Sequence, residues 1–149
     1  MTITGPATAV TDADRAAIAA VPARMVETWA KHDPDGFAEL FTEDGTLILP
    51  GVHRRGRDQI RAFMAAEFAG AYRGTRVTGQ PVDVIPLAPG AVALTTVGGV
   101  LAPGESELSA EAAIRASWIL VKRADAWLLA IYHNCPRDPA APGGEVAAA

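Results

Sequence analysis

The chain has 149 residues, of which half are hydrophobic and a fifth are charged, a composition that suits one globular domain with a substantial core. Its net charge of −4 argues against nucleic acid as a partner, because binding to phosphates requires a basic surface. The single cysteine, Cys135, excludes a disulfide within the chain and zinc sites built on paired cysteines, and no apolar run reaches the roughly 18 residues of a membrane span.

Residues 1–10 are small and polar and are predicted to form a flexible arm. They contain neither the basic region nor the hydrophobic run of a secretory signal, so we expect a cytoplasmic protein with no membrane partner.

A long helix should follow, because Thr11 or Asp12 can cap its first turn. Its apolar stripe recurs at helical spacing and consists of Ile18, Val21, Met25 and Trp29. Pro22 interrupts this stripe, and we expect a kink just before it, since proline removes one helical hydrogen bond.

Asp33 and Pro34 mark the start of a second, short helix, with aspartate at the cap and proline at the first helical position. The side chains expected to point inward from this region are Phe37, Leu40 and Phe41. Residues 43–45, Glu-Asp-Gly, predict a turn. A strand over 46–49 should follow and end at Pro50.

Residues 52–55, Val-His-Arg-Arg, are predicted to form a loop between this strand and a third helix, which opens at Gly56. The apolar face of the third helix is formed by Ile60, Phe63, Met64 and Phe68.

From Thr75 onward the pattern alternates with a period of two, which predicts strands near 75–86, 91–101, 110–123 and 126–135. Short turns join them, so neighbouring strands should pair antiparallel. Gly98 and Gly99 lie inside a strand pattern, where glycines indicate a bend or a bulge. Residues 11–136 therefore form the predicted domain, and residues 137–149, rich in Pro, Ala and Gly, a disordered tail.

Among the polar residues, His133 is the candidate general acid or base, because histidine exchanges protons near neutral pH. The alternative is a histidine at the sheet rim that is satisfied by a backbone carbonyl. Asn134, Arg115 and His53 are candidates for orienting a ligand. The alternatives are an ion pair of Arg115 with Glu111 and a simply exposed His53.

No metal site is predicted, because the three histidines are scattered and no carboxylates stand at ligand spacing. No cofactor is predicted either, since phosphate loops and dinucleotide fingerprints are absent.

If Trp29 and Trp118 face a hollow between the helices and the sheet, their rings give it flat apolar walls. The alternative is that the tryptophans pack in the core. A two-residue loop of Ala124 and Asp125 would pair Trp118 with Ile131 and Ala116 with His133. A three-residue loop would shift each of these pairs.

Five segments together carry a family resemblance. They are Trp29-Ala30-Lys31-His32-Asp33, Phe41-Thr42-Glu43-Asp44-Gly45, Gly56-Arg57-Asp58-Gln59-Ile60, Arg115-Ala116-Ser117-Trp118-Ile119-Leu120-Val121, and Trp127 followed by His133-Asn134. On these residues the chain resembles the NTF2-like superfamily, and within its SnoaL-like proteins the SgcJ/EcaC-type branch, whose members are associated with enediyne antibiotic biosynthesis.

The resemblance implies an α+β cone, with three N-terminal helices packed on a strongly curved mixed or antiparallel sheet. It also implies a homodimer through the outer face of the sheet and no obligatory cofactor. The chain departs from ketosteroid isomerases, whose catalytic aspartate has no counterpart in Leu47-Ile48-Leu49-Pro50. It departs from scytalone dehydratases as well, since Ala30 stands where an aspartate follows the aromatic residue.

Three functions remain open. The first is a polyketide-pathway protein that promotes cyclisation, isomerisation or release of a hydrophobic intermediate, with Trp29, Leu49, Phe63 and Trp118 lining the hollow. The second is a non-catalytic carrier or accessory module for a polyketide synthase. The third is a structural dimer whose cone is filled by its own side chains.

Overall fold

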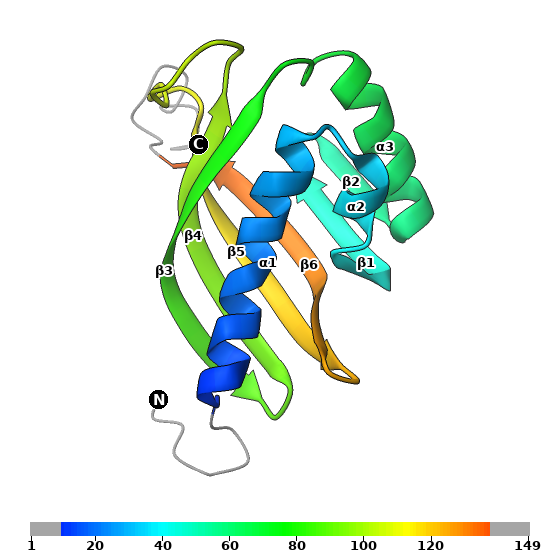
Figure 1. Cartoon of the computed structure of the whole chain (residues 1–149), viewed down its shortest axis with the longest axis vertical. Coiled ribbons are helices and arrows are strands. Elements are labelled where there is room, and N and C mark those ends of the chain that lie inside the picture. Colours follow the sequence, from blue (N-terminus) through cyan, green and yellow to red (C-terminus); the bar gives the residue numbers. More distant parts are fainter. Residues whose placement is uncertain (1–9, 138–149) are drawn as a thin grey trace, which may run out of the picture.

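The computed structural model describes residues 10–137 as three helices packed against one face of a six-stranded sheet (Figure 1). In chain order the elements are α1 (Asp12–Ala30), α2 (Pro34–Ala38), β1 (Phe41–Leu49), β2 (Val52–Arg55), α3 (Arg57–Ala69), β3 (Arg76–Ala88), β4 (Ala91–Leu101), β5 (Ala113–Arg123) and β6 (Ala126–Pro136). The flexible arm and the disordered tail predicted at the two ends fall, at 1–9 and 138–149, outside the described residues.

The strand order across the sheet is β2-β1-β6-β5-β4-β3. β1 and β6 run parallel, and every other neighbouring pair is antiparallel. Strands β3 and β4 bend along their length, and α1 lies across the concave side of the sheet (Figure 1). The predicted α+β fold, with helices on a curved mixed sheet, is confirmed.

The first helix begins as predicted. The Thr11 hydroxyl accepts a hydrogen bond from the Asp14 backbone nitrogen at 3.0 Å, and the Asp14 carboxylate accepts one from the Thr11 nitrogen at 3.4 Å. This reciprocal arrangement satisfies two backbone donors that the first turn would otherwise leave unpaired. The apolar stripe is buried, and the helix continues through Pro22 without interruption.

Two local predictions between α2 and α3 are wrong. The predicted turn at 43–45 lies inside β1, and the predicted loop at 52–55 is the strand β2, which pairs antiparallel with β1. The register of β1 against β6 shifts between Phe41 and Thr46, so this stretch is an irregular strand. A Cβ at Gly45 would lie 2.9 Å from the Leu129 carbonyl oxygen, so close packing against β6 explains the glycine better than a turn does.

Gly98 and Gly99 likewise pack closely, and no bulge forms at them. The pairing of β3 with β4 runs unbroken through both residues. A Cβ at Gly98 would collide with the Thr78 carbonyl oxygen, and one at Gly99 with the Ala112 carbonyl oxygen. The shifts between β3 and β4 lie further along, between Pro81 and Asp83 and between Pro86 and Ala88.

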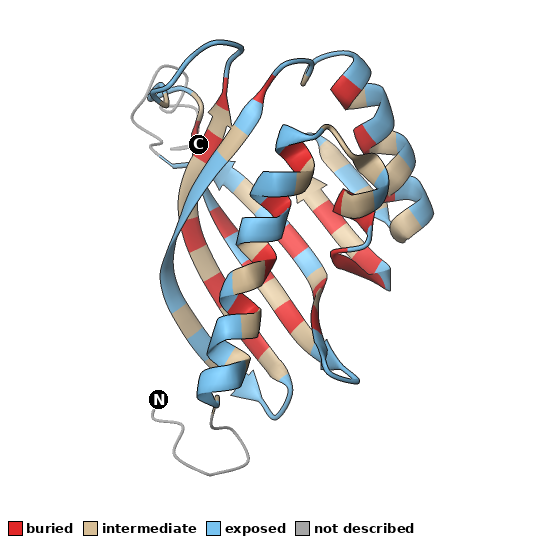
Figure 2. Cartoon of the chain, in the orientation of Figure 1, coloured by how far each residue is buried: buried red, intermediate tan, exposed pale blue. Residues whose placement is uncertain are grey.

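The buried residues lie on the helices and strands where these face each other, between the helical layer and the concave face of the sheet (Figure 2). Along β4 every second residue, from Val92 to Thr96, is buried there. Within residues 10–137, no helix combines the length and the hydropathy that crossing a membrane requires.

Candidate functional site

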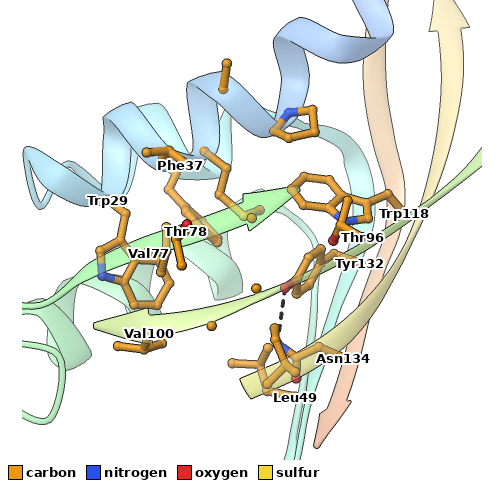
Figure 3. Close-up of a pocket in the computed structure, with 18 of the residues that line it drawn as sticks. Trp29, Phe37, Leu49, Val77, Thr78, Thr96, Val100, Trp118, Tyr132 and Asn134 are labelled. Carbon is orange, nitrogen blue, oxygen red and sulfur yellow. Dashed lines mark hydrogen bonds between the residues drawn. The ribbon is translucent and has the colours of Figure 1, made fainter. Parts of the chain in front are cut away.

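A cavity of about 250 Å³ lies between α1 and the concave face of the sheet (Figure 3). Its wall is mainly apolar. Helix α1 contributes Pro22, Met25, Val26 and Trp29, while the sheet contributes residues of β1, β3, β4, β5 and β6. The hollow expected from the sequence therefore exists, and its own side chains do not fill it.

Trp29 and Trp118 lie at opposite parts of the cavity wall (Figure 3). The indole nitrogen of Trp29 donates to the Thr75 hydroxyl at 2.9 Å, and that of Trp118 donates to the Thr96 hydroxyl at 2.9 Å. Because both N–H groups already have partners, the rings contribute apolar surface to the cavity. Trp29 also packs edge-on against Phe68, with ring centroids 5.5 Å apart.

A bulge in β6 decides which of its residues enter the cavity. Arg123 pairs with Ala126, so the loop has the two residues expected from the sequence. The pairing then shifts: Leu120 faces Leu129 but Ile119 faces Ile131, which leaves Ala130 as an extra residue.

The shift changes the expected partners of β5. Trp118 faces Tyr132, and Ala116 faces Asn134. Because side chains alternate between the two faces of a strand, one extra residue exchanges the faces of everything that follows it. Tyr132 and Asn134 consequently line the cavity.

His133, the candidate general acid or base, therefore does not line the cavity. His133 is exposed on the outer face of the sheet, opposite Ser117. Arg115, also exposed, lies on the same face of β5, two residues from Ser117. His53 is exposed on β2, opposite Ile48.

Phe63 is also misplaced by the sequence prediction. It is half-buried on α3 but does not line the cavity, and its ring packs under the Arg54 guanidinium at 4.9 Å. Of the predicted lining residues, the structure brings together Trp29, Leu49, Trp118 and Asn134.

Tyr132 is one of the lining residues that sequence reasoning missed. Its hydroxyl oxygen accepts a hydrogen bond from the Asn134 side-chain nitrogen at 3.1 Å (Figure 3). Burial raises the pKa of Tyr132 to about 12, against a smaller lowering effect of the Asn134 hydrogen bond. The aromatic pair that Tyr132 forms with Trp118, with centroids 4.9 Å apart, depends on the bulge and has no signal in the sequence.

The side-chain oxygen of Asn134 is buried and has no hydrogen-bond partner among residues 10–137. Buried polar atoms in folded proteins nearly always have partners, so such an atom beside a cavity indicates a place for a ligand or a water molecule.

Within the described part of the chain, no Asp, Glu, His, Lys or Arg side chain lines the cavity. Tyr72, the second phenol there, has a pKa raised first by burial and then by the charge of Glu67. Both phenols are therefore neutral donors at physiological pH. No group of His, Cys, Asp or Glu side chains suited to a metal ion occurs among the described residues.

Comparison with known proteins identifies the family. The family model described as a SnoaL-like domain matches residues 23–119, which is more than half of the chain. The chain is a SnoaL-like protein.

Solved structures agree with this fold. A domain of unknown function with a cystatin-like fold from Nostoc punctiforme superimposes on this SnoaL-like protein with a TM-score of 0.83 at 27% identity, covering 93% of this chain and 86% of that one. An NTF2-like protein with a cystatin-like fold from Novosphingobium aromaticivorans gives a TM-score of 0.74 at 20% identity, with 87% and 85% covered. A ketosteroid isomerase-like protein from Erwinia carotovora atroseptica gives 0.68 at 17% identity, with 87% and 100% covered. No curated protein matches the chain significantly.

The cavity of this SnoaL-like protein can thus enclose apolar surface and offer hydrogen bonds from neutral groups. Among residues 10–137, its lining holds neither a carboxylate nor a histidine, the groups with which enzymes commonly remove a proton near neutral pH.

Proposed function

We propose that this protein binds a hydrophobic intermediate of polyketide biosynthesis in its cavity and holds it as a non-catalytic accessory module for a polyketide synthase in the cytoplasm. The observation that carries the proposal is the apolar cavity between Trp29 and Trp118, whose described lining contains no charged side chain. Burial of a ligand's apolar surface stabilises the complex by about 25 cal/mol per Å² before the entropic cost of binding is subtracted.

The resemblance to the SgcJ/EcaC-type branch supports a more specific assignment, an intermediate of enediyne biosynthesis. The flat rings of the two tryptophans suit a conjugated polyene or fused-ring skeleton, because planar ligands stack on aromatic faces.

A second candidate function, promotion of cyclisation or isomerisation, is supported by the Tyr132 hydroxyl in the cavity wall. A neutral hydroxyl can donate a hydrogen bond to an oxygen that gains negative charge in a transition state. With a pKa of about 12, however, Tyr132 does not serve as a base at neutral pH. His133 takes no part in either function, because it lies on the other face of the sheet.

Incubation of the purified protein with a linear conjugated polyene, of the kind that an iterative polyketide synthase releases, separates the two candidates. Retention of unchanged polyene, measured by native mass spectrometry and by quenching of tryptophan fluorescence, supports the carrier. A new product that accumulates beyond one equivalent supports the enzyme.

A pair of matched variants locates the binding. Val100→Phe places a larger ring at a cavity-lining position of β4 and should abolish binding, whereas Val82→Phe adds the same ring at an exposed position of β3 and should leave binding unchanged. Equal binding by both variants places the ligand elsewhere and contradicts the proposal.

We also propose a homodimer through the outer face of the sheet. A row of apolar residues crosses this face from strand to strand and consists of Ile85, Ala93, Ile119 and Ile131. Ile85 and Ile131, at the two ends of this row, are 44% and 40% exposed, and a continuous exposed apolar row is typical of an interaction surface. A symmetric partner would cover the row by placing the same face against it.

A further inference from the structure

The polar pair of Tyr132 and Asn134 specifies what the ligand must carry. Both residues come from the segment of β6 that follows the bulge, and both line the cavity (Figure 3). They are hydrogen-bonded to each other through one contact of 3.1 Å. That contact leaves part of the hydrogen-bonding capacity of each group unused.

As the amide is placed, Asn134 donates to the Tyr132 oxygen. The tyrosine O–H then remains available as a donor, and the Asn134 oxygen remains available as an acceptor. If the amide is rotated by half a turn, Tyr132 donates to the Asn134 oxygen, and the asparagine N–H becomes the free donor while the tyrosine oxygen becomes the free acceptor. Either orientation leaves at least one donor and at least one acceptor of the pair unused.

We infer that the cavity selects a neutral molecule with an apolar skeleton and one hydroxyl group, an alcohol, enol or phenol, which binds between Tyr132 and Asn134. This inference rests on the proposed binding function and adds the chemical class of the ligand. A hydroxyl both accepts and donates, so it satisfies both free groups at once.

Other oxygen groups fit the pair less well. With the amide as placed, a ketone or an ether accepts from the Tyr132 hydroxyl but leaves the Asn134 oxygen without a partner, and an unsatisfied buried polar group is costly. A carboxylate would place a negative charge beside a free acceptor oxygen, in a cavity whose described lining holds no cation to neutralise it. A hydrocarbon leaves both groups unpaired.

Four naphthalene probes of similar size test the inference by isothermal titration calorimetry at pH 7. These are 2-naphthol, 2-methoxynaphthalene, 2-methylnaphthalene and 2-naphthoate. We expect 2-naphthol to bind about tenfold or more tightly than 2-methoxynaphthalene, since the ether cannot donate to Asn134. The methyl compound should bind no better than the ether, and 2-naphthoate should bind most weakly.

Variants assign the preference to the pair. In Tyr132→Phe/Asn134→Leu the preference for 2-naphthol over 2-methylnaphthalene should disappear, while the methyl compound still binds. His133→Gln, on the outer face of the same strand, is the matched control and should retain the preference. Tyr132→Phe alone, which keeps the ring, replaces the double variant if that variant does not fold, and should reduce the preference.

The outcomes separate the two levels of the proposal. Equal affinity of the wild-type protein for 2-naphthol and 2-methoxynaphthalene overturns the hydroxyl assignment and leaves hydrophobic binding standing. A preference that persists in Tyr132→Phe/Asn134→Leu also overturns the assignment, and so does an undiminished preference in Tyr132→Phe where that variant replaces the double variant. If no probe binds, the proposed function fails, and the hydroxyl assignment fails with it.

Discussion

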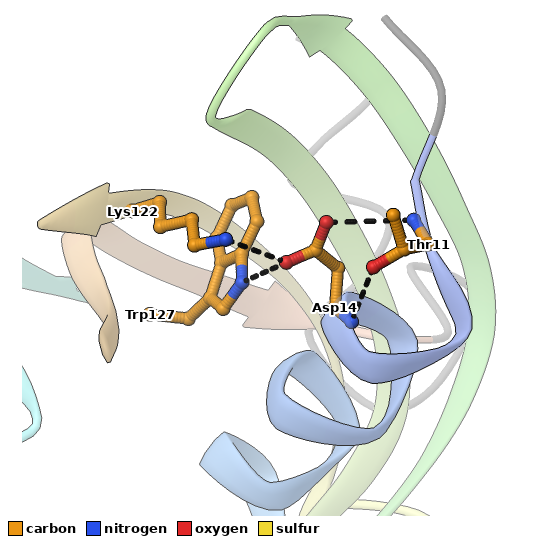
Figure 4. A network of polar contacts seen from close by, with 4 residues as sticks. All are labelled: Thr11, Asp14, Lys122 and Trp127. Atoms are coloured by element: carbon orange, nitrogen blue, oxygen red, sulfur yellow. Dashed lines mark hydrogen bonds and ion pairs between the residues drawn. The ribbon is translucent and has the colours of Figure 1, made fainter. Parts of the chain in front are cut away.

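The carboxylate of Asp14 accepts a hydrogen bond from the indole nitrogen of Trp127 at 3.1 Å, which joins the first turn of α1 to the start of β6 (Figure 4). The same carboxylate oxygen pairs with the Lys122 ammonium group at 3.1 Å. Asp14 therefore caps its own helix and anchors that helix to the end of the sheet. The position of α1 over the cavity depends in part on this contact.

The Asp14 contact predicts a pH dependence of stability. Hydrogen bonds from Lys122 first and from Trp127 second lower the pKa of Asp14 from 3.8 to about 2. Because the pKa is lower in the folded state, the contribution is fully present above about pH 4 and is lost as the pH falls towards 2. In thermal unfolding between pH 5 and pH 2, the wild-type melting temperature should fall more steeply than that of Asp14→Asn. Asp12→Asn, in the same turn, should follow the wild type, and parallel curves for all three proteins would falsify this role of Asp14.

Thr96→Val should destabilise the fold. The Thr96 hydroxyl accepts from the Trp118 indole nitrogen at 2.9 Å in a buried site, so the substitution leaves a buried donor unpaired, at a cost of about 1–3 kcal/mol. In the double variant Thr96→Val/Trp118→Phe the indole donor is removed as well, so the loss of stability should be smaller than the sum of the losses in the two single variants. Urea unfolding of the double-mutant cycle measures this coupling. Thr95→Val, next in sequence but on the outer face, is the control and should not be coupled to Trp118→Phe. Additive losses in Thr96→Val/Trp118→Phe would contradict the prediction.

Gly98 and Gly79 face each other across β4 and β3 and predict different responses to alanine. A Cβ at Gly98 would collide with the Thr78 carbonyl oxygen, whereas the nearest atom to a Cβ at Gly79 is the Val97 carbonyl oxygen at 3.9 Å. Gly98→Ala should therefore lower the free energy of unfolding by about 1–3 kcal/mol or more, since a crowded backbone cannot yield easily. Gly79→Ala should change it far less. Urea denaturation tests the difference, and similar losses at both positions would show that the close approach at Gly98 is unimportant.

Ile131→Glu should dissociate the proposed dimer without unfolding the protomer. Ile131 is 40% exposed in the single chain, so a glutamate there should change the stability of the monomer little. In the dimer the same carboxylate would be buried without a positively charged partner, which disfavours association. Sedimentation velocity gives the mass, and circular dichroism checks the fold. Val82→Glu, at an exposed position outside the apolar row, is the matched control. A wild-type protein that sediments as a monomer would refute the dimer.

Local patterns were sufficient for most of the secondary structure. The apolar stripe of α1, the cap at Asp33 and the alternation along β4 each depend on residues close in sequence, and each is confirmed. The predictions at 43–45 and 52–55 failed, because Glu-Asp-Gly and a charged tetrapeptide resemble turn and loop sequences. Residues 52–55 form a strand because they pair with β1 in a hairpin, and residues 43–45 bridge two segments of β1 that pair with β6.

The three helices and every strand except β2 were predictable from the sequence alone, because periodicity and composition record which side chains avoid water. The family resemblance implied the α+β class, and the sequence named Trp29, Leu49 and Trp118 only as candidates for the wall of a hollow. Only the tertiary structure decided that Tyr132 enters the cavity and His133 leaves it. A single extra residue at Ala130 reverses the faces of β6, and the alternation of that strand is equally compatible with either register until its partner strands are in place.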